Sequence, residues 1–96
     1  MTSKQRAYLR GLANTVTAIF QVGKNGISDN FVKQVDEALE ARELIKLTVL
    51  ETSPDEISDI ANSLAQSTNS ELLQIVGSKI TLFRQKKKNS KISLPK

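Results

Sequence analysis

The residues best suited to chemistry in this sequence form a short turn flanked by glycines, Gly23-Lys24-Asn25-Gly26. Glycines at both ends of a turn let backbone amide groups approach a bound anion closely. Lys24 adds a positive charge and Asn25 a neutral donor, and the next acid along the chain is Asp29. If a helix follows the turn, its first N–H groups and positive dipole end favour a phosphate as well. Glycines also occur at such turns for conformational reasons alone, so the spacing leaves both interpretations open.

The turn does not match the nucleotide-binding loops. A Walker loop needs an earlier glycine before its Gly-Lys pair, and a dinucleotide-binding fingerprint needs a third glycine. Asn25-Gly26 would favour a hairpin between two strands, but the residues after Gly26 have helical rather than alternating periodicity. The sequence therefore predicts a turn between a strand and a helix and disfavours nucleotide binding.

Hydrophobic periodicity predicts the elements that position this turn. Helical spacing predicts helices over residues 2–16 and 29–42 and from residue 53 onward. Short β-branched or alternating runs predict strands over residues 18–22, 44–50, 72–76 and 80–83. Thr2 with Gln5 resembles a capping box, and Ser53-Pro54 followed by two acids is typical of a helix start.

This order of elements predicts an α/β fold, a two-layer αβαβαββ domain with a four-stranded mixed sheet. Helices between successive strands favour right-handed crossovers and a largely parallel sheet. Gly77-Ser78-Lys79 should close a final antiparallel hairpin. We expect one domain over residues 1–96, in which residues 85–96 form a basic, partly flexible tail.

The composition argues against an enzyme. The sequence has no histidine and no cysteine, which removes the usual general base, the thiolate nucleophile and the commonest metal ligands. The acids best placed for a hydrolase, Asp55, Glu56 and Asp59, already suit a helix start. No apolar run approaches the roughly 20 residues of a membrane-spanning helix. We expect a non-catalytic, cytoplasmic, monomeric protein without metal, cofactor, small-molecule substrate or membrane partner.

Charge is strongly segregated along the chain. Residues 1–26 contain four basic residues and no acid, and residues 72–96 contain seven basic residues and no acid. Residues 27–71 contain three basic residues and ten acids. If the fold brings the two basic ends together, their field would attract a polyanion. The alternative is a solvated amino end and a loose basic tail.

Several segments together resemble a known family over nearly the whole chain. In order, they are "SKQRAYLRGLA", "FQVGKNGI", "VDEALEARELIKLTVL", "LLQIVG", "ITLFR" and "KISLP". They resemble the CRM (chloroplast RNA splicing and ribosome maturation) domain of bacterial YhbY-like proteins. The resemblance implies a single-domain RNA-binding protein associated with precursors of the large ribosomal subunit. It also implies a fold similar to the C-terminal domain of translation initiation factor three and a GxxG loop like that of KH domains.

The resemblance assigns candidate RNA-binding residues. It places the GxxG loop on residues 23–26, the basic first helix on residues 4–10 and the late strand motif on residues 80–84. Phe83 stands where relatives often have tyrosine, which leaves a hydrogen bond there in doubt. The lysine run after residue 85 is less specific to the family. The candidates are Lys4, Arg6, Arg10, Gly23, Lys24, Asn25, Gly26, Arg84, Lys86, Lys87 and Lys88.

The chain has few aromatic residues to stack on bases, and Phe20 and Phe31 better suit the core. We therefore predict recognition of the RNA backbone and shape, with affinity dominated by phosphate contacts. The loop and the basic ends are expected to form one surface. An alternative is a protein-docking adaptor, in which Asp36, Glu37 and Glu40 on one helix face meet a basic partner.

Overall fold

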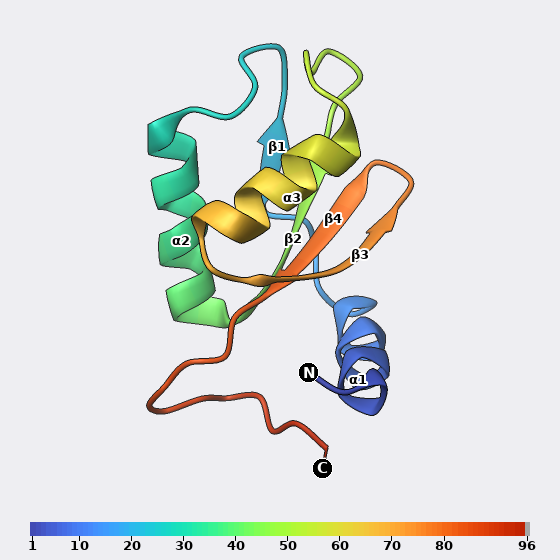
Figure 1. Ribbon diagram of the computed structural model, residues 1–96, viewed down its shortest axis with the longest axis vertical. Coiled ribbons are helices and arrows are strands. Elements are labelled where there is room, and N and C mark those ends of the chain that lie inside the picture. Colours follow the sequence, from blue (N-terminus) through green and yellow to red (C-terminus); the bar gives the residue numbers. More distant parts are fainter. Residues whose placement is uncertain (96) are drawn as a thin grey trace.

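Seven elements follow one another in the order αβαβαββ within residues 1–95, the part of the chain that the computed structural model describes (Figure 1). They are α1 (Ser3–Ala13), β1 (Phe20–Val22), α2 (Asp29–Arg42), β2 (Leu44–Val49), α3 (Ile57–Ser67), β3 (Glu71–Val76) and β4 (Lys79–Phe83). The bounds of α2 agree with the prediction, and every predicted strand is present. The predicted tail ends at Lys96, which lies outside the described residues.

The strands form one mixed sheet in the order β1-β2-β4-β3. β1 pairs with β2 in parallel, with Phe20 opposite Leu47, whereas β4 is antiparallel to both of its neighbours. The prediction of a largely parallel sheet was therefore wrong, although a mixed sheet is confirmed. The hairpin at Gly77 places β4 beside β3, and β4 is one of the two inner strands, in agreement with the burial of its residues from Ile80 to Phe83.

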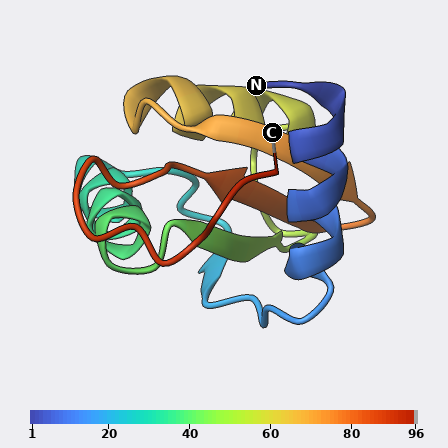
Figure 2. The same ribbon diagram turned by 90° about the horizontal axis from the view of Figure 1, so that it is seen from below.

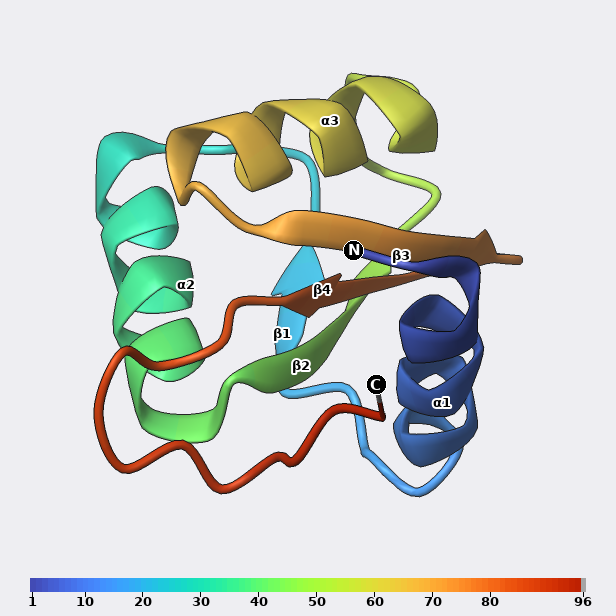
Figure 3. The same cartoon turned by 60° about the horizontal axis from the view of Figure 1, so that its bottom comes forward.

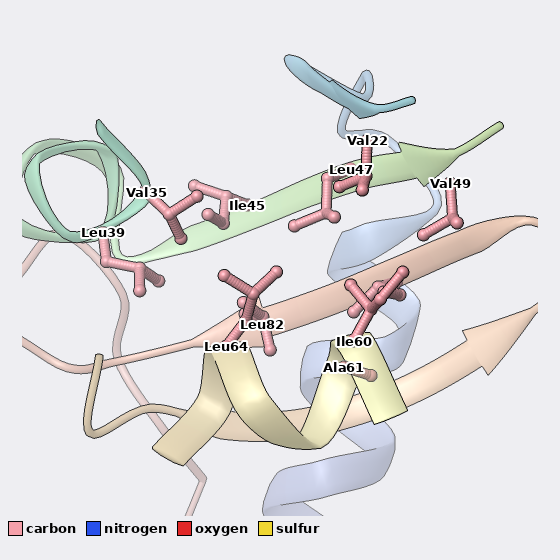
Figure 4. Close-up of a cluster of buried hydrophobic side chains, with 11 residues drawn as sticks. Val22, Val35, Leu39, Ile45, Leu47, Val49, Ile60, Ala61, Leu64 and Leu82 are labelled. Atoms are coloured by element: carbon pink, nitrogen blue, oxygen red, sulfur yellow. The ribbon is translucent and has the colours of Figure 1, made fainter. Parts of the chain in front are cut away.

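Helices cover both faces of the sheet, so the expected two-layer arrangement is also corrected. α2 and α3 pack on one face over the main core cluster (Figure 4), which contains Val22, Val35, Leu39, Ile45, Leu47, Val49, Ile60, Ala61, Leu64, Ile80 and Leu82. α1 and the tail pack on the other face, over Leu44, Leu73 and Phe83 (Figure 2). The reason is that β2 and β4 carry apolar side chains on both faces, and each face must be covered.

The structure confirms the predicted cap of α1 and corrects the predicted end of α1 and start of α3. Thr2 and Gln5 form the predicted capping box at the start of α1. α1 ends at Ala13 rather than near residue 16, and the chain continues in turns. α3 begins at Ile57 instead of residue 53, because Ser53 belongs to a turn in which its N–H donates to Leu50 O at 3.0 Å.

None of the helices within residues 1–95 combines the length and apolarity needed to cross a membrane.

Candidate nucleic-acid interface

The GKNG loop, residues 23–26, is a tight turn at the end of β1. The N–H of Gly26 donates to Gly23 O at 3.0 Å, and Gly26 has a φ of 64°, which favours glycine. Lys24 and Asn25 at the tip are exposed. The strand before and the helix after confirm the predicted setting of this turn.

Packing of aromatic rings holds the loop between its two elements. The rings of Phe20 in β1 and Phe31 in α2 meet edge to face, with centroids 5.6 Å apart. Both residues pack against the main core cluster, which agrees with the prediction that they serve the core. The loop is therefore fixed at both ends, and only its tip is available to a ligand.

The start of α2 is already provided with acceptors. Ser28 caps the helix, because its Oγ accepts the N–H of Phe31 at 3.0 Å. Asp29 adds a carboxylate to the first turn. Both groups interact with the positive end of the helix, so they reduce its attraction for an external phosphate.

A second acidic segment lies beside the loop, contrary to the expectation drawn from the sequence. The chain between β2 and α3 runs next to the GKNG loop at the top of Figure 1. A Cβ added to Gly26 would lie 3.4 Å from Pro54 Cγ and 3.8 Å from Asp55 Oδ2. Asp29, Asp55 and Asp59 line one groove between α2 and α3 below the loop. The GKNG loop is therefore close to a carboxylate, that of Asp55, which is distant from it in the sequence.

Arg6 is the one candidate on α1 with partners inside the fold. Its Nη2 lies 2.8 Å from Glu71 Oε2, and its Nη1 donates to Leu72 O at 3.3 Å. These contacts tie α1 to β3. Lys4 and Arg10 are exposed and form no salt bridge with any acid among residues 1–95.

Arg84, at the end of β4, is used mainly inside the protein. Its Nη1 donates to Asp36 Oδ1 at 2.6 Å and to Thr68 O at 2.7 Å. Its Nη2 donates to Asp36 O at 3.0 Å and to Glu40 Oε2 at 3.4 Å. These bonds join β4, α2 and the end of α3, and they leave few of the five guanidinium donors for a ligand. They also occupy two of the three acids of the predicted adaptor face, Asp36 and Glu40.

Glu43, which the sequence reasoning did not single out, binds the tail. It caps the end of α2 and is 1% exposed. Its carboxylate accepts the N–H of Lys86 at 3.0 Å, the hydroxyl of Ser90 at 2.6 Å and the N–H of Lys91 at 2.6 Å. Burial by itself would raise the pKa of the Glu43 carboxyl, but hydrogen bonds from Ser90 and from the tail backbone outweigh burial and lower this pKa.

The tail then crosses to α1. Ile92 and Leu94 pack against the cluster beneath α1, and Gln5 Nε2 donates to Pro95 O at 3.1 Å. Figure 3 shows the tail passing from the end of β4, around the end of α2, to the side of α1. Of the two alternatives that the charge pattern left open, the structure therefore shows the one in which the two basic ends meet, within residues 1–95.

The two basic segments, α1 and the tail, consequently meet at one end of the molecule, the lower end in Figure 1. We call their basic residues, apart from Arg6, the basal surface; it consists of Lys4, Arg10, Lys86, Lys87, Lys88 and Lys91. None of these six forms a salt bridge with an acid among residues 1–95. The GKNG loop lies at the opposite end (Figure 1), so the expectation of one surface formed by the loop and the basic ends was wrong.

The part of the chain that the structure describes has no cluster of acidic side chains arranged to hold a metal ion. The chemistry open to the basal surface is the binding of phosphates by ammonium and guanidinium groups. At the loop it is hydrogen bonding from the exposed tip.

Comparisons with known proteins show what the chain is similar to. A model of the CRS1 / YhbY (CRM) domain matches residues 1–84. The chain is 46% identical over 95 residues to the "Probable RNA-binding protein YqeI" of Bacillus subtilis, with 99% of each chain covered. It is 28% identical over 96 residues to an RNA-binding protein of Haemophilus influenzae, covering 100% of this chain and 96% of the other.

A solved structure shares the fold. A hypothetical protein from Staphylococcus aureus, determined in solution, is 47% identical, with a TM-score of 0.81 and 99% of each chain covered. The family model covers the GKNG loop and all seven elements described above, and it ends where the basic tail begins. The resemblance inferred from the sequence is therefore confirmed, and the chain belongs to the family of the CRS1 / YhbY (CRM) domain.

Proposed function

We propose that this chain is a non-catalytic RNA-binding protein that acts as a monomer and contacts RNA mainly through the basal surface. One observation carries this proposal: the tail contacts α1, so that two basic segments meet at one end of the molecule, and six of their basic residues form no salt bridge with an acid among residues 1–95. Such a surface favours a polyanion through its field and through direct phosphate contacts. The names of the Bacillus and Haemophilus relatives support RNA as that polyanion.

The GKNG loop is proposed as a second, smaller contact. Its exposed tip presents Lys24 and Asn25, and the glycines keep the backbone accessible. Because carboxylates lie near it, this contact depends on placing a nucleotide at hydrogen-bonding distance rather than on charge alone. A folded RNA that extends along the protein can reach both ends.

The family resemblance supports a more specific target, the ribosomal RNA of large-subunit precursors, and a role in ribosome assembly in the cytoplasm. Crosslinking in cells followed by mapping of the bound RNA tests this target. Enrichment of large-subunit precursor RNA over mature RNA and messenger RNA is the expected result. An even distribution over cellular RNAs would contradict the ribosomal assignment while leaving RNA binding intact.

Salt titration of binding tests the RNA-binding function itself. For a footprint of about three to five phosphates on single-stranded RNA, the slope of log affinity against log salt should be roughly −2 to −3.5. A slope near zero would contradict recognition through phosphates. The basal surface also predicts that most of this slope disappears when its lysines are neutralised, because each of them releases counterions on binding.

A further inference from the structure

The tail needs an external anchor to keep a defined course. Residues 85–95 form no helix or strand, and they carry Lys86, Lys87, Lys88 and Lys91 without any acid. A segment of this composition repels itself and tends to stay disordered. Even so, it follows one path across the face of the sheet (Figures 2 and 3). The contacts that hold it there decide where its lysines are presented.

Glu43 supplies the polar part of this anchor. Both of its carboxylate oxygens are used, since Oε1 accepts from Lys91 and Oε2 from Lys86 and Ser90. Hydrogen bonds to an ionised carboxylate are stronger than those between neutral groups. No basic side chain forms a salt bridge with Glu43 within residues 1–95, so the tail itself satisfies this buried charge.

Docking of the tail and burial of Glu43 therefore depend on each other. An ionised carboxylate is costly to bury without hydrogen-bond donors, and these donors are present only when residues 86–91 lie against it. The backbone of Glu43 is held as well, because its N–H donates to Leu39 O at 2.8 Å and its carbonyl accepts the N–H of Arg84 at 2.9 Å. The anchor is thus part of the rigid corner between α2 and β2.

The anchor binds the tail by its backbone and leaves the charged groups available. Lys86 and Lys91 contribute their main-chain N–H groups to Glu43, not their ammonium groups. Lys87, Lys88 and Lys91 remain exposed. At the other end of the tail, Gln5 and the apolar contacts of Ile92 and Leu94 bring the segment against α1.

We propose that Glu43 is a positioning residue for RNA binding, which holds the tail so that its lysines and the basic residues of α1 form one preorganised surface for RNA phosphates. This inference rests on the proposed function and deepens it. Preorganisation raises affinity because the ligand need not order a mobile segment on binding. An acid buried beneath the basic surface thereby strengthens the binding of an anion.

The test replaces Glu43→Gln, with Glu37→Gln as the matched control on the exposed face of the same helix. Glutamine keeps the size of the side chain, but its NH2 group cannot accept the hydrogen bonds that a carboxylate oxygen of Glu43 accepts from the tail. Simple electrostatics predicts tighter RNA binding for both variants, because each loses a negative charge. The anchor predicts the opposite sign for E43Q alone, with affinity for a folded ribosomal RNA fragment reduced about three- to tenfold.

Hydrogen exchange follows the anchor directly. The amides of Lys86 and Lys91 should lose protection in E43Q and keep it in E37Q. Ser90→Ala removes one donor in the exposed tail and should cause a smaller loss of the same kind, which keeps the test valid if E43Q does not fold. In a background with Lys86, Lys87, Lys88 and Lys91 all changed to glutamine, E43Q should have no further effect on RNA affinity.

Different results would overturn the positioning role of Glu43, its anchoring of the tail, and the basal surface. If E43Q frees the tail amides but binds RNA as tightly as the unmodified protein, the positioning role is overturned and RNA binding through the lysines stands. Unchanged protection in both E43Q and S90A would overturn the anchor itself. If the four lysine substitutions leave RNA affinity unchanged, the proposed basal surface is overturned, and this inference with it.

Discussion

The two ends of the molecule offer opposite means of holding an RNA. At the basal surface, α1 and the tail meet, and they carry six basic residues without an ion-pair partner among residues 1–95. At the loop end, Asp55 lies beside Gly26 of the GKNG loop, and Asp29 follows the loop in the first turn of α2. Charge therefore attracts an RNA to one end, whereas the other end contributes through the geometry of a turn. The difference teaches that a sequence motif and an electrostatic surface need not coincide.

The largest expected effect comes from reversing charge at the basal surface. Changing Lys86, Lys87 and Lys88 to glutamate should reduce RNA affinity about 100-fold or more at moderate salt, because phosphate attraction turns into repulsion. Lys33→Glu, on the exposed face of α2, is the control and should have a far smaller effect. Filter binding with a ribosomal RNA fragment measures both. Equal effects would mean that only net charge matters and would remove the contrast between the ends.

The next effect concerns stability at the loop end. Gly26→Ala should lower the free energy of unfolding by about 1–2 kcal/mol, because alanine is strained at a positive φ. The new Cβ also meets Pro54 Cγ at 3.4 Å. The control is Gly11→Ala in α1, where a Cβ has no neighbour within 4 Å and alanine favours the helix. Urea denaturation measures the free energy of unfolding of both variants. An unchanged value for G26A would show that the turn is not rigid.

A smaller effect tests the loop as a contact. Lys24→Ala should reduce RNA affinity about threefold and flatten the salt slope by roughly 0.7, the loss expected for one phosphate contact on a single strand. Circular dichroism should not change, since Lys24 is exposed. Unaltered affinity and slope would confine RNA binding to the basal end.

The smallest effect is on the pH dependence of the tail. Because the folded-state pKa of Glu43 is lowered, its contribution to stability is present above the unfolded pKa of about 4.3 and is lost as pH falls through the folded value. NMR signals of the tail should therefore shift only in strong acid. A transition near pH 6 would contradict the hydrogen bonds to Glu43.

The sequence predicted those features that depend on neighbours along the chain. The range of α2 was found because its apolar spacing is regular and Ser28 is a good cap. The start of α3 was placed too early because Ser53-Pro54 suits a turn as well as a helix start. In the structure these residues form a turn, and Pro54 lies beside Gly26.

Contacts between distant residues were not visible in the sequence. Arg6 and Arg84 read as free cations until Glu71 and Asp36 were placed beside them. Glu43 read as one of ten acids, although its position at the corner between α2 and β2 makes it the anchor of the tail. Periodicity identifies which face of a helix is buried, but it does not identify which polar groups meet across the fold.

The meeting of α1 and the tail has a consequence for how the protein becomes active. Gln5 and Pro95, which form a hydrogen bond where α1 meets the tail, are 90 residues apart in the chain. Such a long-range contact closes a large loop, so it is expected to form late in folding. A nascent chain in which residues 85–95 have not yet been made has the GKNG loop and most of the core but only two of the six residues of the basal surface. Affinity for RNA would then increase when the tail docks.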